Sequence, residues 1–293
     1  MPPKKNLLLC FDAFGTLFTP QPSVPEQYSD VARRHGLTGF SVEELNSTFR
    51  KAFKDEAKQH PNYGKSVGMK PPQWWANIIS KTFQPFLKPQ QTLPSQLIPD
   101  LIHRFSSKDG YRIFEDVLPF FTMLRTNKEH LRSLDQHFPP PSIDPELSAQ
   151  WPWQKTVVGI ITNSDDRIPD ILSSFGLNIG HRRVGARQGE IAKADIAEDV
   201  SFVVISYDAG FEKPDPRIFG AAVGMLEECL AAEAARDGSV ASSDGFEKLY
   251  VGDEVLKDAV GASKAGWDAI LLDREGKFHN DFEKEKEAII TWI

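Results

Sequence analysis

The chain has 293 residues, of which 40% are hydrophobic and 26% charged, and its formal net charge is -7. That composition is typical of a globular protein, and the length suffices for one large domain or a core with a smaller second domain. Negative charge without a long basic run argues against nucleic acid as a partner, and no apolar run approaches the roughly 20 residues that span a bilayer. The only cysteines, Cys10 and Cys229, favour a reducing compartment, so we expect a cytoplasmic protein, with the nucleus as the alternative.

The first strand is predicted at residues 7–11, an unbroken apolar run of the kind that is buried on both faces of a parallel sheet. The run ends at Asp12, and Gly15 permits a turn three residues later. Open α/β sheets carry their chemistry at the carboxyl ends of such strands, where a carboxylate can act as a nucleophile or a metal ligand. The alternative is that Asp12 only caps the turn. The partners that other strands bring to the same edge decide between the two.

A helical block follows the first strand. Residues 24–105 show helical spacing with hardly a strand signal, and Ser41 opens a capping box. An all-helical block after one strand of a parallel sheet indicates an inserted domain. We therefore predict a helical domain over residues 19–110 and a core formed by residues 1–18 and 111–293.

The rest of the chain alternates strand and helix patterns, which predicts an α/β fold with a Rossmann-like parallel sheet. Further buried strands are predicted at residues 156–161, 201–206, 248–251 and 269–272. Loop insertions of unknown role are predicted near residues 139–153, 181–199 and 236–245.

Polar residues follow four of the predicted strands. They are Asp12 after the first strand, Thr162 and Asn163 after the second, Lys213 downstream of the third, and Asp253 with Asp258 after the fourth. Right-handed crossovers place the carboxyl ends of parallel strands at one edge, where these side chains can converge. Like charges at close range raise each other's pKa unless a cation intervenes. Lys213 can offset one carboxylate, and Mg²⁺ could offset the others.

These motifs resemble those of the haloacid dehalogenase (HAD) superfamily. The matching segments are Asp12-x-x-Gly15-Thr16-Leu17, Ile160-Ile161-Thr162-Asn163, Glu212-Lys213-Pro214-Asp215-Pro216 and Val251-Gly252-Asp253-x-x-x-x-Asp258-x-x-Gly261-Ala262. Each segment is weak alone, but four in the right order at strand ends form a specific signal. The helical domain stands where that superfamily inserts its cap. Within it, residues 60–64, Gly68 and Trp74-Trp75 resemble the cap of one eukaryotic subgroup.

The resemblance implies a phosphatase that acts on a small-molecule phosphate ester. Asp12 would be the nucleophile and would form an aspartyl-phosphate. Thr162 would hydrogen-bond the transferring phosphoryl group, with Asn163 also among the substrate-binding residues. Lys213 would hold Asp12 and the phosphoryl charge together. Electrostatic stabilisation of this kind is usually the largest catalytic contribution to phosphoryl transfer.

The resemblance also implies a Mg²⁺ site. Asp12, Asp253 and the backbone carbonyl of Phe14 would ligate the ion. Asp258 would orient Lys213 rather than bind the metal, and Glu254 would support the metal from outside its ligand shell.

Phe14 departs from the phosphatase pattern, which has a general acid and base Asp at this position. Proton transfer of that kind typically contributes about 10²–10⁴-fold, so we expect weak or specialised phosphatase activity. An aromatic residue here also occurs in the metal-free 2-haloacid dehalogenases of the superfamily. Asp253 argues against that alternative, because it would repel a substrate that carries a carboxylate. Among the candidate functions, the phosphatase is ranked first, a non-catalytic HAD fold retained for interaction second, and the dehalogenase third. Neither the substrate nor the oligomeric state follows from the sequence.

Overall fold

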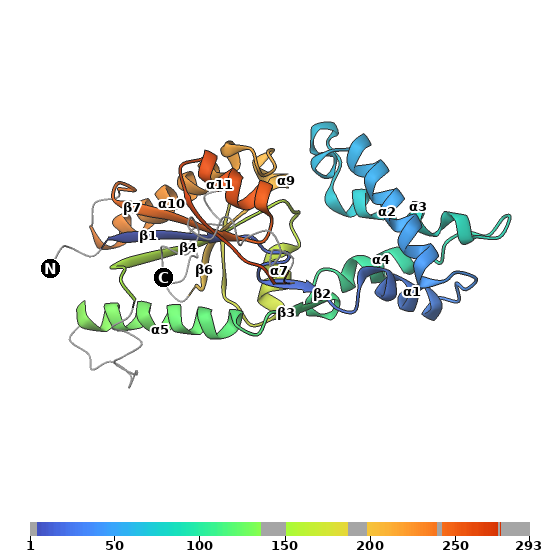
Figure 1. The fold of residues 1–293 in the computed structure, drawn as a ribbon, viewed down its shortest axis with the longest axis horizontal. Coiled ribbons are helices and arrows are strands. Elements are labelled where there is room, and N and C mark those ends of the chain that lie inside the picture. Colours follow the sequence, from blue (N-terminus) through green and yellow to red (C-terminus); the bar gives the residue numbers. More distant parts are fainter. Residues whose placement is uncertain (1–4, 136–150, 187–197, 239–241, 275, 277–293) are drawn as a thin grey trace.

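A six-stranded parallel sheet forms the centre of the protein (Figure 1). The structure is a computed structural model, and it describes residues 5–135, 151–186, 198–238, 242–274 and 276 of the chain. The strands lie in the order β5-β6-β4-β1-β7-β8. Their bounds are β1 Asn6–Phe11, β4 Lys155–Thr162, β5 Ile179–Arg183, β6 Val200–Ile205, β7 Phe246–Gly252 and β8 Asp268–Leu271. The predicted α/β class with a Rossmann-like parallel sheet is confirmed.

Helices cover both faces of this sheet (Figure 1). Successive side chains of β1 point to opposite faces, so that Leu8 and Cys10 join one buried cluster while Leu7 and Leu9 join the other. Helices α10 and α11 cover the first cluster, and α5 and α7 cover the second. The bounds are α5 Val117–Asp135, α7 Ile168–Ser174, α10 Pro216–Asp237 and α11 Val260–Lys264. The unbroken apolar run of β1 reflects this double burial.

A group of helices, which we call the helical lobe, lies beyond the carboxyl end of β1 (Figure 1). It consists of α1 Val24–Arg34, α2 Val42–Gln59, η1 Asn62–Val67, α3 Pro71–Phe83, η2 Gln84–Phe86, α4 Leu97–Arg104 and η3 Lys108–Gly110. At the start of α2, the Glu44 backbone N–H donates to Ser41 Oγ at 3.1 Å, and the Ser41 N–H donates to the Glu44 carboxylate at 2.8 Å. This reciprocal pair is the capping box that the sequence predicts.

The two connections between the lobe and the rest of the chain form a small antiparallel sheet. Strand β2 (Phe18–Pro20) pairs with β3 (Tyr111–Ile113). The rings of Phe18 and Tyr111 pack with their centroids 5.0 Å apart. Three-residue strands are too short to show a period of two, so the sequence predicted neither. They lie where the sequence placed the division between the helical domain and the core.

The prediction of a loop over residues 181–199 is partly wrong, because β5 extends to Arg183 and so includes the first residues of that range. This edge strand pairs only with β6, and its register shifts between Ile179 and Arg182. Its polar sequence gave no strand signal, since an edge strand does not need an apolar run. Residues 187–197, most of 139–153 and part of 236–245 lie outside the described residues.

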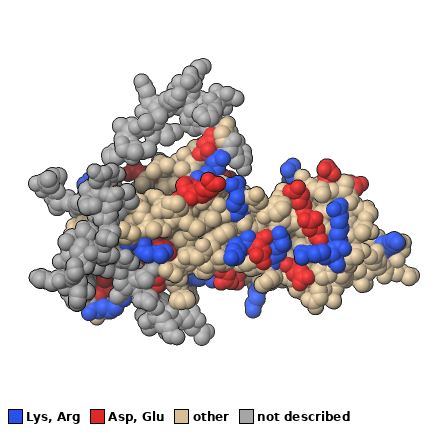
Figure 2. All heavy atoms as spheres, turned by 90° about the horizontal axis from the view of Figure 1, so that it is seen from below, with Lys and Arg blue, Asp and Glu red and all other residues tan. Residues whose placement is uncertain are grey.

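One face of the described surface mixes charges of both signs. In the view of Figure 2, acidic and basic side chains of the described residues are interspersed over the lobe and the core rather than gathered by sign. Among the helices that the structure describes, none combines the length and the apolar character needed to cross a membrane.

Candidate active site

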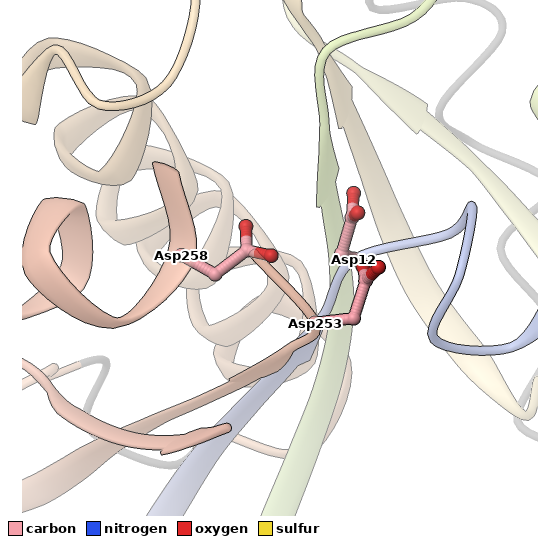
Figure 3. A group of neighbouring side chains, drawn as sticks. All are labelled: Asp12, Asp253 and Asp258. Atoms are coloured by element: carbon pink, nitrogen blue, oxygen red, sulfur yellow. The ribbon is translucent and has the colours of Figure 1, made fainter. Parts of the chain in front are cut away.

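Three carboxylates meet at the carboxyl edge of the sheet (Figure 3). Asp12 follows β1 and Asp253 follows β7, the strand hydrogen-bonded beside it. Asp258 comes from η4 (Val255–Ala259), a turn of π-helix after Asp253, and reaches toward the other two. One oxygen of each carboxylate lies within 4.8 Å of an oxygen of the others. The sheet topology thus brings together acidic residues from distant parts of the sequence.

Two glycines make this close approach sterically feasible. Gly15 has a positive φ of 74°, and a Cβ at this residue would stand 2.2 Å from Asp253 Oδ2. A Cβ on Gly252 would stand 2.3 Å from the carboxyl carbon of Asp258. Side-chain atoms do not approach so closely, so any other residue at either position would displace a carboxylate.

Lys213 is the buried cation of the site. Its Nζ lies 2.8 Å from Asp12 Oδ1 and 2.6 Å from Asp258 Oδ1. The second oxygen of Asp258 accepts a hydrogen bond from the Glu254 backbone N–H at 2.9 Å. Both oxygens of Asp258 are therefore engaged within the protein, one of them with Lys213.

The end of β4 supplies Thr162 and Asn163. Thr162 is buried, and the polar influence of its hydroxyl lowers the pKa of the Asp12 carboxyl, against the larger effect of burial. The Asn163 amide holds the backbone of Lys213: its oxygen accepts from the Lys213 N–H at 2.6 Å, and its nitrogen donates to the Lys213 carbonyl at 3.0 Å. The sequence placed Asn163 among the substrate-binding residues, whereas its contacts here position the lysine.

The remaining predicted residues, Phe14 and Glu254, have their side-chain contacts elsewhere. The Phe14 ring packs against the rings of Phe18 and Tyr111, with centroid distances of 4.8 and 5.5 Å. The Glu254 carboxylate pairs with Lys257 at 2.8 Å.

Negative charge exceeds positive charge in this site. Burial raises the pKa of the Asp12 carboxyl, although the Lys213 ammonium acts in the opposite direction. Burial, followed by repulsion from Asp12 and Asp258, raises the pKa of Asp253 to about 6. Burial disfavours the Lys213 ammonium, yet the two carboxylates beside it hold its pKa above the ordinary value. One ammonium faces three carboxylates, which is an environment that favours binding of a further cation.

Sequence reasoning missed Tyr250, whose hydroxyl lies 2.8 Å from Lys213 Nζ. The tyrosine is in β7, and its hydroxyl also contacts the carbonyl of Ile161 at 2.7 Å. The sequence offers one sign of this role: Tyr250 carries a hydroxyl within a predicted buried strand, three residues before Asp253.

The helical lobe contacts the core beside the site. The indole N–H of Trp75 donates to Asp165 at 2.7 Å, and the Arg167 guanidinium pairs with Asp165 while lying 4.5 Å from the centroid of the Trp75 ring. The Tyr63 hydroxyl donates to the carbonyl of Asn163 at 3.4 Å. Lobe side chains therefore reach the segment that follows β4.

The chain belongs to the haloacid dehalogenase-like hydrolase family, whose model matches residues 7–266. The resemblance stated from the four motifs is thereby confirmed. The fold is similar to that of a defluorinating L-2-haloacid dehalogenase, with a TM-score of 0.52, 12% sequence identity, and coverage of 92% of this chain and 82% of that one. At that identity the likeness shows the fold alone.

The relatives refine the family assignment. The chain is 28% identical over 280 residues to haloacid dehalogenase-like hydrolase domain-containing protein 3 of Danio rerio, covering 94% of this chain and 89% of that protein. It is 25% identical over 267 residues to the Homo sapiens protein of the same name, covering 90% and 81%. An uncharacterized hydrolase of Schizosaccharomyces pombe is 28% identical over 289 residues, covering 97% and 100%. The subgroup suggested by residues 60–64 and Trp74-Trp75 is the one these animal proteins represent.

Proposed function

We propose that the protein is a Mg²⁺-dependent phosphatase that hydrolyses a small-molecule phosphate ester through an aspartyl-phosphate on Asp12. The observation that carries the proposal is the pairing of Asp12 with Lys213 at 2.8 Å while a second carboxylate, Asp253, lies beside it. Lys213 favours the ionised form of Asp12, and only that form can attack.

The residues present fit a magnesium ion. Oxygen atoms are the ligands that Mg²⁺ prefers, and carboxylates in a negatively charged cleft supply them. Asp12, Asp253 and the Phe14 carbonyl would hold the ion. Asp258 is left out of this set because its two oxygens are engaged by Lys213 and by a backbone N–H. Glu254 would act from outside this set. A bound Mg²⁺ would offset the charge that the phosphoryl group brings to the carboxylates.

In the first step, the Asp12 carboxylate attacks phosphorus, and the bond from phosphorus to the ester oxygen breaks. The Thr162 hydroxyl and the charge of Lys213 stabilise the phosphoryl group during transfer. The departing oxygen takes its proton from solvent, because the Phe14 side chain has none to give. In the second step, water attacks phosphorus and releases a proton to solvent, the bond to Asp12 breaks, and inorganic phosphate leaves. Without an acid or base at position 14, both steps are slow.

The helical lobe is the cap of this enzyme in our proposal, with residues 19–110 as the cap and residues 1–18 and 111–293 as the core. Its contacts at Trp75 and Tyr63 support this role, because they bring lobe side chains to the segment beside Asp12. A cap that closes over the carboxylates would exclude water and shape the substrate pocket.

A 2-haloacid dehalogenase is the second enzymatic candidate, and the aromatic Phe14 is the observation in its favour. In that reaction Asp12 attacks carbon and halide leaves, with no need for a metal. Asp253 disfavours it, because its carboxylate lies within 4.8 Å of the nucleophile, where a 2-haloacid must place its own negative charge. A HAD fold kept only for interaction would show neither reaction.

One experiment separates these functions. Purified protein is assayed with aryl and alkyl phosphates in the presence of Mg²⁺, and with 2-haloacids in its absence, beside an Asp12→Asn control. We expect phosphate release that requires Mg²⁺ and disappears in the control. Halide release without metal would replace the proposal with the dehalogenase, and no turnover of either class would favour the interaction protein.

A further inference from the structure

The ammonium of Lys213 has three oxygen neighbours within the protein. A lysine ammonium carries three donors and no acceptor. Its Nζ lies 2.8 Å from Asp12 Oδ1, 2.6 Å from Asp258 Oδ1 and 2.8 Å from the Tyr250 hydroxyl. Nζ donates hydrogen bonds to the Asp258 carboxylate and to the uncharged Tyr250 hydroxyl, and it forms an ion pair with Asp12. The two hydrogen bonds fix the position of Nζ, and with it the distance of the charge from Asp12.

The Tyr250 hydroxyl has a fixed position and a fixed polarity. Tyr250 is fully buried, and its ring packs edge-on against Phe219 with a centroid distance of 5.2 Å. Its single hydroxyl proton is directed to the carbonyl of Ile161 at 2.7 Å, which is shorter than its 3.2 Å contact with Asp258. With that proton engaged, the oxygen can only accept from Lys213. Ile161 belongs to β4, so the phenol connects Lys213 to the strand beside β1.

We infer that Tyr250 is a positioning residue for the proposed reaction, on which this inference rests: it accepts one donor of Lys213 and thereby holds Nζ against Asp12. The charge of Lys213 then stands at a fixed place beside the nucleophile. Tyr250 itself touches neither the nucleophile nor the substrate.

The substitution Tyr250→Phe tests this role, because it keeps the packed ring and removes only the hydroxyl. The matched control is Tyr111→Phe, which removes another buried hydroxyl, one that donates to the carbonyl of Phe105 at 3.3 Å. Both variants are assayed for Mg²⁺-dependent hydrolysis of p-nitrophenyl phosphate. In parallel, the ¹⁵N–¹H signal of the Lys213 ammonium is recorded at low temperature and assigned by its loss in Lys213→Met. Melting temperatures show that each variant is folded.

We expect Tyr250→Phe to lower kcat about tenfold or more, the effect of removing one hydrogen bond to a charged group. KM should stay within about twofold, because Tyr250 does not contact substrate, and the Lys213 ammonium signal should shift or broaden. Tyr111→Phe should change neither kcat nor the signal. A purely structural role would lower stability in both variants without moving the Lys213 signal.

Three results would overturn the inference. An unchanged ammonium signal in Tyr250→Phe would show that the hydroxyl does not hold Lys213. A changed signal with unchanged kcat would show that the contact has no consequence for the reaction. Wild-type protein that hydrolyses no phosphate ester would remove the proposed reaction itself, and a shifted ammonium signal would then report only a structural contact.

Discussion

The substitution Phe14→Asp tests how much activity is limited by the absence of an acid at this position. A carboxyl group there can protonate the departing ester oxygen, which matters for alkyl phosphates and hardly for aryl phosphates with stable leaving groups. The kcat/KM value reports the steps up to leaving-group departure, so it isolates this effect from hydrolysis of the aspartyl-phosphate. We expect kcat/KM to rise by about 10²-fold or more for alkyl phosphates, the range of general acid catalysis, and far less for aryl phosphates.

The structure also sets the cost of this substitution. Phe14 has two edge-on aromatic contacts, with Phe18 at 4.8 Å and with Tyr111 at 5.5 Å. Each such pair stabilises by about 0.5–1.5 kcal/mol, so removing both should lower the free energy of unfolding by about 1–3 kcal/mol. A carboxylate in this half-buried position adds a desolvation penalty. We therefore expect the melting temperature to fall by several degrees.

Phe14→Asn is the matched control, because it loses the same aromatic contacts as Phe14→Asp and its side chain is nearly the same size as that of aspartate, but it carries no acid. Kinetics with one alkyl and one aryl phosphate are measured for wild type and both variants, together with melting curves. The ratio of the Asp to the Asn variant on the alkyl ester isolates proton transfer. If both variants are folded and that ratio is near one, the missing acid does not limit the reaction, and the phosphatase proposal loses its explanation for weak activity.

Three further predictions concern the metal site and the lobe. Isothermal titration with Mg²⁺ should give binding heats for wild type that Asp253→Ala abolishes. Equal heats from both proteins would contradict the proposed Mg²⁺ site. Gly15→Ala should lose about 2 kcal/mol of stability and most Mg²⁺ binding, because its Cβ would lie 2.2 Å from Asp253 Oδ2. The control is Gly36→Ala, which has a similar positive φ but nothing within 4 Å of its Cβ, so it should lose stability without losing Mg²⁺ binding. Burial opposes ionisation of Glu56, but hydrogen bonds from Lys81, Asn77 and His60 outweigh it and lower its pKa below 4.5. Denaturant titrations should therefore show Glu56→Gln about 2 kcal/mol less stable than wild type near pH 7, with the difference shrinking as the pH falls below about 4.5; a difference that is independent of pH would contradict this account.

The sequence located five of the six strands of the parallel sheet, together with the strand ends where polar residues gather, because both signals are local. The apolar run before Asp12 and the one before Asp253 are each unbroken and each end at a carboxylate. Parallel strands place such ends at one edge, so the convergence of Asp12, Lys213 and Asp253 followed from topology alone.

The contacts that orient the site were not readable from the sequence, because they depend on three-dimensional neighbours. Asn163 faces the Lys213 backbone only because the segments after β4 and β6 lie side by side. Tyr250 reaches Lys213 across the sheet, and nothing in its strand distinguishes it from a packing aromatic. The strands β2 and β3 are short, and β5 is polar, so none of them produces a recognisable period.

The central claim is that phosphoryl transfer passes through Asp12, and chemical trapping tests it most directly. Protein turning over p-nitrophenyl phosphate with Mg²⁺ is quenched and reduced with borohydride, which converts an aspartyl-phosphate to homoserine. The peptide containing residue 12 is then examined by mass spectrometry. The p-nitrophenolate group leaves without an acid, so the first step is fast with this ester, whereas the Phe14 side chain cannot activate water for the second step. The intermediate should therefore accumulate, and we expect homoserine at position 12 in wild type only when both ester and Mg²⁺ are present. Phosphate release without any label at Asp12, or equal release by Asp12→Asn, would contradict the account.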